Sequence, residues 1–408
     1  MTFPMISFIP ALRQTARRLL ASAALLAMMT SGAQAFDTKA RAAFVIDMTT
    51  GTVLLDKNAD DPLPPASMSK LMTLYIAFEA LRDGQLQLEE KLPVSQHAMS
   101  YGGSTMFLNT QDRVAVQDLL RGIIVLSGND ACAVLAEALS PDGTEQGFAR
   151  LMTQRAAQLG MTASQFKNAS GWPAEGHVMS MRDLTLLASH IIKDFPDFYP
   201  IFSERKFAFD GRAPSNTTNR NPLLALDIGA DGLKTGHTAE AGYGLVGSAK
   251  NGERRVVFAI TGLDSAAERA EQSEAIVNWA FRQFAEQTIV KQGQPVTQAE
   301  LWLGAEDAVD LVAEKDITLL LPTMTAGGVK AEVVYTGPIE APVKQGQRLA
   351  ELIIQPEGLP ETRVPLVAAG DVAAGGFFDR MMTVSAVLLK RFTAQPSEME
   401  TEAAQDAT

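Results

Sequence analysis

Three short motifs carry serines, two lysines and an asparagine in an arrangement that suits nucleophilic catalysis. In chain order they are Ser67-Met68-Ser69-Lys70, Ser127-Gly128-Asn129 and Lys234-Thr235-Gly236. A serine hydroxyl is a weak nucleophile at neutral pH and needs a neighbouring base to take its proton. On a helix, residues i and i+3 share one face, so Lys70 can reach the Ser67 hydroxyl. The first motif therefore predicts a serine nucleophile with lysine as its base.

The pKa of Lys70 decides whether it can act as that base. Burial and a nearby cation both disfavour the protonated form of a lysine, and Lys234 is a candidate for that cation. A helix that begins at Ser67 would also aim the backbone N–H group of this residue at a developing oxyanion. These groups together can form and stabilise an acyl-serine intermediate.

The second and third motifs supply groups that suit proton transfer and substrate binding. Ser127 offers a hydroxyl that can relay a proton to a leaving group, and the Asn129 amide can hold Lys70 or a substrate carbonyl. The run Lys234-Thr235-Gly236, followed by His237, is expected at a strand edge. Such an edge can pair with an extended peptide and bind its terminal carboxylate.

Each motif alone also has an ordinary structural interpretation. The second is typical of a helix-capping turn, and Lys234 could be a solvated lysine at a sheet edge. Ser164-Gln165-Phe166-Lys167 matches the Ser-x-x-Lys pattern as well, although no long helical pattern follows it. The order and spacing of the three motifs therefore carry the prediction.

A helix that begins at Ser67 must carry the nucleophile. Apolar residues recur after it at spacings of three and four, and Gly84 follows at a helix stop. Those apolar residues are Leu71, Leu74, Tyr75, Phe78 and Leu81. Residues 116–125 and 131–139 also have helical patterns, and they flank the second motif.

Strands are expected near both ends of the same segment. The candidates are residues 42–47, 51–55, 243–249 and 255–263. The last two are antiparallel strands joined by the turn Asn251-Gly252, and residues 266–284 form a closing helix. This order predicts one α+β domain over residues 36–288, with its sheet assembled from both ends.

Beyond residue 288 the pattern changes to short apolar or alternating runs separated by Gly and Pro. Examples of these separators are Gly327-Gly328 and Gly337-Pro338. Strands at this density predict a small all-β domain over residues 289–374. It contains no histidine and no cysteine, so a catalytic role is not expected there.

Residues 375–392 carry a broad apolar stripe at helical spacing. Its members include Phe377, Met381, Val384, Leu388 and Phe392. Asp379 and Arg380 argue against a helix that spans a membrane. The stripe is expected to lie in a membrane interface, or alternatively to pack on the β-rich domain. The acidic tail, residues 393–408, is expected to be disordered.

The first 35 residues have the pattern of a secretory signal peptide. Three arginines precede an apolar run, and Ala33-Gln34-Ala35 forms a small-residue exit. Cleavage after Ala35 removes three arginines and no acid, which takes the formal charge from −12 to −15. An exported protein with so acidic a charge is not expected to bind nucleic acid.

The content of cysteine and histidine limits other kinds of chemistry. Cys132 is the single cysteine, so no intrachain disulfide can form, and it is expected to be a buried small side chain. The four histidines are scattered without metal-ligand spacing. No metal and no cofactor are predicted.

Longer runs around the three motifs resemble those of a known family. They are residues 65–70, 127–132 and 231–238. Over essentially the whole mature chain, the sequence is similar to the D-alanyl-D-alanine carboxypeptidases, low-molecular-mass penicillin-binding proteins of the penicillin-binding protein 5 group. The resemblance implies a penicillin-recognising serine peptidase domain, with an antiparallel sheet covered by helices, followed by a β-rich domain and a terminal amphipathic anchor.

The resemblance also implies a role for each motif residue. Ser67 is the acylated nucleophile and Lys70 its base, Ser127 and Asn129 form a proton-relay and binding pair, and Lys234 to Gly236 form the carboxylate-binding strand. The backbone amides of Ser67 and His237 form an oxyanion hole, Thr235 touches the substrate carboxylate, and Arg220 lies near that site. His177 and the loop of residues 102–104 border the cleft without an assigned step.

The favoured activity is removal of the terminal D-alanine from a peptidoglycan pentapeptide, with β-lactams as inhibitors. The protein is expected in the periplasm, attached to the outer leaflet of the inner membrane by residues 375–392. A β-lactamase is the nearest rival, but class A enzymes need an added glutamate for deacylation. In the segment where that glutamate is expected, the chain has Thr162-Ala163-Ser164-Gln165. A non-catalytic wall-binding protein is a third alternative, disfavoured because binding needs no nucleophile paired with a base.

Overall fold

The structure is a computed structural model that describes residues 36–212, 215–323, 329–356, 359 and 361–376. The predicted signal peptide, nearly all of the predicted helix over residues 375–392, and the acidic tail lie outside the described residues. No helix within the described ranges is long and apolar enough to cross a lipid bilayer.

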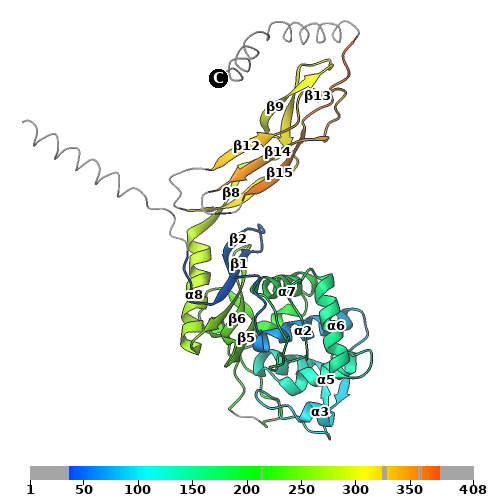
Figure 1. The fold of residues 1–408 in the computed structure, drawn as a ribbon, viewed down its shortest axis with the longest axis vertical. Helices are drawn as coiled ribbons and strands as arrows, with labels where there is room; N and C mark the ends of the chain where they lie inside the picture. The colour runs from blue at the N-terminus through cyan, green and yellow to red at the C-terminus, as the bar shows by residue number, and fades with distance from the viewer. Residues whose placement is uncertain (1–35, 213–214, 324–328, 357–358, 360, 377–408) are drawn as a thin grey trace, which may run out of the picture.

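A five-stranded antiparallel sheet forms the centre of the N-terminal part (Figure 1). Its order is β2 (Val53–Lys57), β1 (Ala42–Asp47), β7 (Arg254–Leu263), β6 (Gly242–Asn251) and β5 (Ala230–Thr238). The first strand of the chain thus pairs with β7, which confirms that both ends of the segment build one sheet. The turn predicted at Asn251-Gly252 joins β6 to β7, and Gly252 adopts a φ of 61°, which glycine tolerates.

Alternating side chains of this sheet serve two separate cores. Phe44, Val246 and Val257 pack in the cluster that contains the central helices. Their chain neighbours Val45, Leu245 and Phe258 pack with the closing helix α8 (Ala266–Gln283) on the other face. This period of two is what a strand buried on both faces requires. The observed fold confirms the predicted α+β class.

A group of helices, which includes those that contain Lys70 and Asn129, lies on one face of the sheet (Figure 1). They are α2 (Lys70–Arg82), α4 (Val116–Arg121), α5 (Asn129–Leu139), α6 (Glu145–Gln158) and α7 (Met181–Asp194). A short helix, α3 (Gln96–Met99), and the strands β3 (Lys91–Pro93) and β4 (Arg113–Ala115) lie at their edge. Two of these helices begin after residue types that are favoured at the N-cap. Thr144 precedes α6 and Ser180 precedes α7, and each side chain accepts a hydrogen bond from the backbone N–H group three residues later.

The start of the nucleophile helix differs from the prediction. Ala66–Ser69 forms a 3-10 turn, η1, and the α-helix begins only at Lys70. The N–H group of Met68 bonds to the Pro65 carbonyl, which is the tighter i→i+3 pattern. The chain enters this turn through Ala66 with a φ of 49°, a conformation that cannot continue an α-helix backwards. Ser67 therefore lies in the turn that leads into α2.

Residues around the second motif form a similar transition. The predicted helix over residues 116–125 is divided into α4 and a π-helical segment, η2 (Gly122–Leu126). Ser127 then takes a left-handed conformation with φ 64° and ψ 35° before α5 begins. A non-glycine residue in this region is strained, and such residues are frequent at functional sites. Two further 3-10 turns, η3 (Tyr199–Ser203) and η4 (Pro222–Ala225), precede β5.

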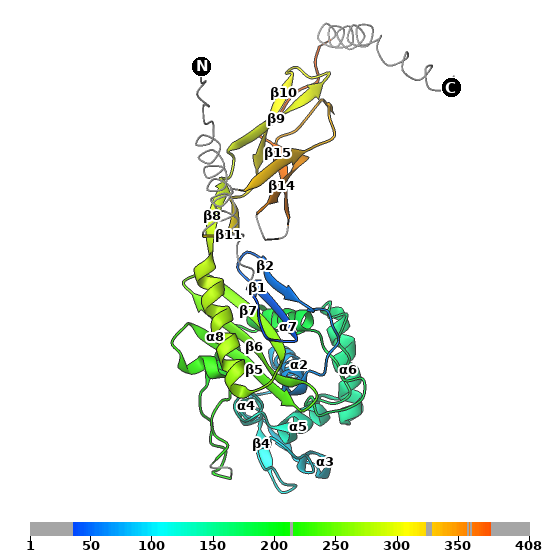
Figure 2. The same ribbon diagram turned by 60° about the vertical axis from the view of Figure 1, so that its left-hand side comes forward.

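A second, all-β part follows directly from α8, and its first strand begins at Phe284, before the predicted start at residue 289. Its strands are β8 (Phe284–Val290), β9 (Pro295–Trp302), β10 (Ala308–Ala313), β11 (Ile317–Pro322), β12 (Lys330–Val334), β13 (Ile339–Glu340), β14 (Arg348–Gln355) and β15 (Thr362–Ala368). They form a six-stranded sheet and the β11–β8 pair, with their own apolar core. Figure 2 shows this part extending beyond the end of α8, away from α2 and α5.

Candidate active site

The serine and the lysine of the first motif are in direct contact. Lys70 Nζ donates a hydrogen bond of 2.9 Å to Ser67 Oγ. It donates two more, of 2.7 Å to Asn129 Oδ1 and 2.5 Å to the carbonyl oxygen of Ser170. Three acceptors thus fix the position of a side chain that is fully buried.

Burial lowers the pKa of Lys70 to about 8, because the charged form loses its hydration. The Arg220 guanidinium lowers this pKa further, whereas the carboxylates of Asp130 and Glu145 oppose the change. Burial likewise holds the pKa of Lys234 well below its usual value, and repulsion from Lys70 and Arg220 adds to this. The site therefore provides a lysine that is partly neutral near physiological pH.

Asn129 is locked in one orientation by its surroundings. Its Nδ2 donates to the Gly102 carbonyl at 2.8 Å, and its backbone N–H group donates to the Ser104 carbonyl at 2.7 Å. The amide oxygen therefore points at Lys70. The sequence left two partners open for this amide, Lys70 or a substrate carbonyl. In the structure the amide oxygen accepts a hydrogen bond from Lys70.

The second and third motifs meet through Ser127 and Lys234. Lys234 Nζ donates to Ser127 Oγ at 2.9 Å and to the Thr235 carbonyl at 3.1 Å. Lys234 is buried, which excludes the interpretation as a solvated lysine. It extends from β5, the edge strand of the sheet, as predicted.

Gly236 allows β5 to lie close to the turn that carries Ser67. A Cβ atom at Gly236 would lie 3.0 Å from the Pro65 carbonyl oxygen and 3.2 Å from the Ala66 Cβ. No larger residue fits without displacing η1. His237, the next residue, is exposed and stacks on Tyr243 at 3.9 Å between ring centroids. The turn with Ser67 and the strand with His237 are thus adjacent.

Arg220 lies beside these motifs and is held by three contacts. Its guanidinium donates to Ser104 Oγ at 2.8 Å, to Asn216 Oδ1 at 3.0 Å and to the Leu126 carbonyl at 3.3 Å. Partial loss of hydration lowers the pKa of Arg220, although the residue remains exposed to solvent. Arg220 and Ser104 line a pocket of about 360 Å³. The arginine therefore adds positive charge next to Lys234.

The remaining sequence candidates have structural partners. His177 Nε2 lies 2.7 Å from Ser69 Oγ, and burial lowers the pKa of His177 to about 4. Cys132 is buried as expected, and burial raises its pKa to about 12. The second Ser-x-x-Lys match forms no such pair, because Ser164 Oγ donates to Asp183 at 2.8 Å instead.

Sequence reasoning missed the backbone acceptors of the site. The carbonyls of Gly102 and Ser170 hold Asn129 and Lys70, and a carbonyl is present in every residue, so no residue type signals its role. Asn168 gives an indirect signal: its Oδ1 accepts from the N–H groups of Ser170, Gly171 and Trp172 and shapes this turn. Trp172 and His177 line a second pocket of about 480 Å³ beside Pro65.

Within the described parts of the chain, no cluster of three or more His, Cys, Asp or Glu side chains is arranged to hold a metal ion.

Comparison with known proteins identifies two family regions. Residues 28–265 match D-alanyl-D-alanine carboxypeptidase, peptidase S11, and residues 284–374 match the C-terminal domain of penicillin-binding protein 5. The D-alanyl-D-alanine carboxypeptidase DacC of Escherichia coli (strain K12) is 36% identical over 351 residues, covering 84% of this chain and 86% of that protein.

Two solved structures have the same fold. Penicillin-binding protein 5 from Haemophilus influenzae superposes with a TM-score of 0.69 at 30% identity, covering 83% of this chain and 98% of that one. Penicillin-binding protein D2 from Listeria monocytogenes, in its ampicillin-bound form, superposes with a TM-score of 0.54 at 33% identity, covering 60% of this chain and 98% of that one. This chain belongs to the D-alanyl-D-alanine carboxypeptidase family, peptidase S11, and has the two-domain build of penicillin-binding protein 5.

Proposed function

We propose that this protein is a serine-type D-Ala-D-Ala carboxypeptidase that removes the terminal D-alanine from peptidoglycan pentapeptides through an acyl-Ser67 intermediate. One observation carries the proposal: Lys70 Nζ is buried, lies 2.9 Å from Ser67 Oγ, and has a pKa lowered to about 8. A lysine in this state can accept the serine proton at the moment of attack.

In the acylation step, Lys70 takes the proton of Ser67, and Oγ attacks the carbonyl carbon of the D-Ala-D-Ala bond. The oxyanion forms between the backbone N–H groups of Ser67 and His237, which belong to the adjacent η1 and β5. The C–N bond breaks, and the leaving amine receives a proton through Ser127. The 2.9 Å hydrogen bond between Lys234 Nζ and Ser127 Oγ supports this relay.

In the second step, water attacks the ester carbonyl, and Ser67 is regenerated with release of the shortened peptide. Lys234, Thr235 and Arg220 are proposed to bind the terminal carboxylate of the substrate, because a charge-assisted pair is strong at a buried site. Penicillins would acylate the same serine, as the ampicillin-bound Listeria relative suggests.

The surroundings of Ser164 favour this function over a β-lactamase. A carboxylate does lie there, but it is Asp183, and it accepts hydrogen bonds from Ala163 N at 2.9 Å and Ser164 Oγ at 2.8 Å. Glu175 is exposed. Slow hydrolysis of the penicilloyl ester is therefore expected, in contrast to a β-lactamase.

We also propose export by residues 1–35 and attachment to the outer leaflet of the inner membrane by residues 375–392. In this arrangement the β-rich domain, residues 289–374, is a spacer that holds the peptidase domain, residues 36–288, away from the membrane. The described chain ends near the start of the loop after β9: Gly375 N donates to the Leu303 carbonyl at 2.8 Å. Figures 1 and 2 support the spacer role, because this end lies at the tip of the β-rich part far from α2 and α5.

The nucleophile is tested by locating the adduct. Incubation of the mature protein with a penicillin should give a covalent adduct on the peptide that contains Ser67, detected by mass spectrometry. Ser67→Ala should lose the adduct and lower D-alanine release from a pentapeptide by on the order of 10³-fold or more. Ser164→Ala is the matched control and should retain both; an adduct at Ser164 would contradict the assignment.

The base is tested by the pH dependence of acylation. Lys70 is protonated below its pKa and neutral above it, so the acylation rate constant should rise with pH and reach half of its plateau near pH 8, given a pKa of about 8. Lys70→Arg should lose acylation at every pH, because arginine stays protonated. Lys167→Arg should leave the profile unchanged. A rate that does not vary between pH 6 and pH 9 would eliminate Lys70 as the base.

The carboxylate site is tested with a substrate whose C-terminus is amidated. Loss of a charge-assisted hydrogen bond of about 1.5–3 kcal/mol should lower kcat/KM by about 10- to 150-fold. Arg220→Gln should reduce the preference for the free acid over the amide. Equal turnover of both peptides by the wild-type protein would exclude recognition of the carboxylate.

The anchor is tested by vesicle flotation. The mature chain should float with vesicles that contain anionic lipid, because the apolar stripe of residues 375–392 loses contact with water there. A chain that ends at Gly376 should stay in solution and still cleave a soluble peptide. It retains Val372, which is buried and bridges to Val343 in the β-rich domain. A full mature chain that remains unbound would show that the stripe is a packing face.

A further inference from the structure

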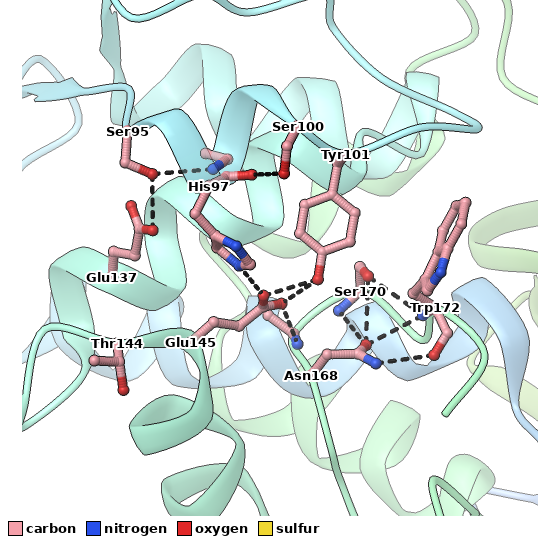
Figure 3. A network of polar contacts seen from close by, with 12 residues as sticks. Ser95, His97, Ser100, Tyr101, Glu137, Thr144, Glu145, Asn168, Ser170 and Trp172 are labelled. Atoms are coloured by element: carbon pink, nitrogen blue, oxygen red, sulfur yellow. Dashed lines mark hydrogen bonds and ion pairs between the residues drawn. The ribbon is translucent and has the colours of Figure 1, made fainter. Parts of the chain in front are cut away.

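A buried carboxylate outside the three motifs joins the two backbone segments that hold Lys70 and Asn129. Glu145 is the first residue of α6, and 3% of its surface is exposed. Its carboxylate accepts a hydrogen bond from the hydroxyl of Tyr101 at 2.7 Å and one from the backbone N–H group of Ala169 at 2.9 Å (Figure 3). His97 Nε2 lies 2.6 Å from the same carboxylate.

The contact with Ala169 leads to Lys70. Ser170 follows Ala169 in the chain, and its carbonyl oxygen is the 2.5 Å acceptor of Lys70 Nζ. The carbonyl of Ala169 itself accepts from Thr73 Oγ1 at 2.6 Å, and Thr73 lies one helical turn after Lys70 on α2. Glu145 thus fixes the backbone that sets the position of the lysine amine.

The contact with Tyr101 leads to Asn129. Gly102 follows Tyr101, and its carbonyl accepts from Asn129 Nδ2 at 2.8 Å. The ring of Tyr101 also lies edge-on to Trp172, with 6.1 Å between the ring centroids. The two segments therefore touch each other as well as Glu145, and both end at the Lys70–Asn129 pair.

We propose that Glu145 is a positioning residue for the acylation step, because its carboxylate ties the loop that contains Tyr101 and Gly102 to the turn that contains Ala169 and Ser170. It touches neither Ser67 nor Lys70. It acts through the carbonyls that hold Asn129 and Lys70, and its charge also opposes the lowering of the Lys70 pKa. The proposal rests on the function given above, in which Lys70 is the base.

The chemistry of the cluster explains why an acceptor is needed at this position. Without one, the Ala169 N–H group would be unpaired in the interior, and the Tyr101 hydroxyl would lose its carboxylate partner. Burial and the charge of Glu145 raise the pKa of Tyr101, so its hydroxyl remains a donor. A glutamine keeps an acceptor for both groups and places an amide N–H beside His97. An alanine has no polar group, so Tyr101, Ala169 and His97 each lose the contact with residue 145.

The test compares Glu145→Ala, Glu145→Gln and Glu137→Ala in acylation by a fluorescent penicillin. Glu137 is the matched control: it also accepts a hydrogen bond in this region, from Ser95 Oγ at 2.8 Å (Figure 3), but Ser95 belongs to neither of the segments that hold Lys70 and Asn129. The measurements are the limiting rate constant of acylation, the dissociation constant of the initial complex, the rate of ester hydrolysis, and the melting temperature.

Glu145→Ala should lower the limiting acylation rate constant of the folded protein by about 10- to 100-fold with little change in the dissociation constant, as expected for a misplaced base. Glu145→Gln should restore the rate to within about threefold of wild type, since the geometry is retained. Glu137→Ala should acylate at the wild-type rate.

Three results would overturn the proposal. If Glu145→Ala acylates at the wild-type rate, the hydrogen bonds of Glu145 to Tyr101 and Ala169 are not needed for acylation. Glu145→Gln that acylates as slowly as Glu145→Ala would show that the charge of Glu145, and not the backbone geometry that its acceptors hold, controls the rate. A wild-type protein that forms no adduct at Ser67 would overturn this proposal and the proposed function together, which distinguishes the two failures.

Discussion

The burial of Lys70 is the constraint on which the site depends. Removing an ammonium group from water costs several kcal/mol unless hydrogen bonds replace the lost hydration. Here Ser67, Asn129 and the Ser170 carbonyl supply three acceptors. Ser67 lies in the 3-10 turn η1, Asn129 begins α5, and Ser170 lies in a turn before α7. Because these parts are far apart in the chain, the fold must bring all three together before the lysine can be buried. The same burial lowers its pKa and makes it a usable base.

Three cations, Lys70, Lys234 and Arg220, lie close enough together to repel one another. Burial lowers the pKa of Lys234, and repulsion from Lys70 and from the solvent-exposed Arg220 lowers it further. A carboxylate at the edge of β5 would neutralise part of this charge. The free site is thus less stable than its contacts alone suggest, which is usual where function requires like charges to be held together.

The sheet fixes where these groups meet. β5 is both the edge strand and the carrier of Lys234, and its neighbour η1 carries Ser67. Gly236 sets the separation of the two, because any side chain there would press on Pro65 and Ala66. The helices on one face then position Asn129 and Glu145, while α8 on the other face supports the sheet and leads into the β-rich domain.

The sequence by itself determined the features that depend on local spacing. The contact of Ser67 with Lys70 follows from an i, i+3 separation, the strands follow from their apolar patterns, and the change to an all-β part follows from the Gly and Pro turns. Only the tertiary structure decided which groups complete the site. The hydrogen bonds of Arg220, the Gly102 and Ser170 carbonyls, and the contacts of Glu145 all join residues far apart in the chain. Backbone carbonyls carry no sequence signal, and burial of a carboxylate depends on packing that local patterns do not encode.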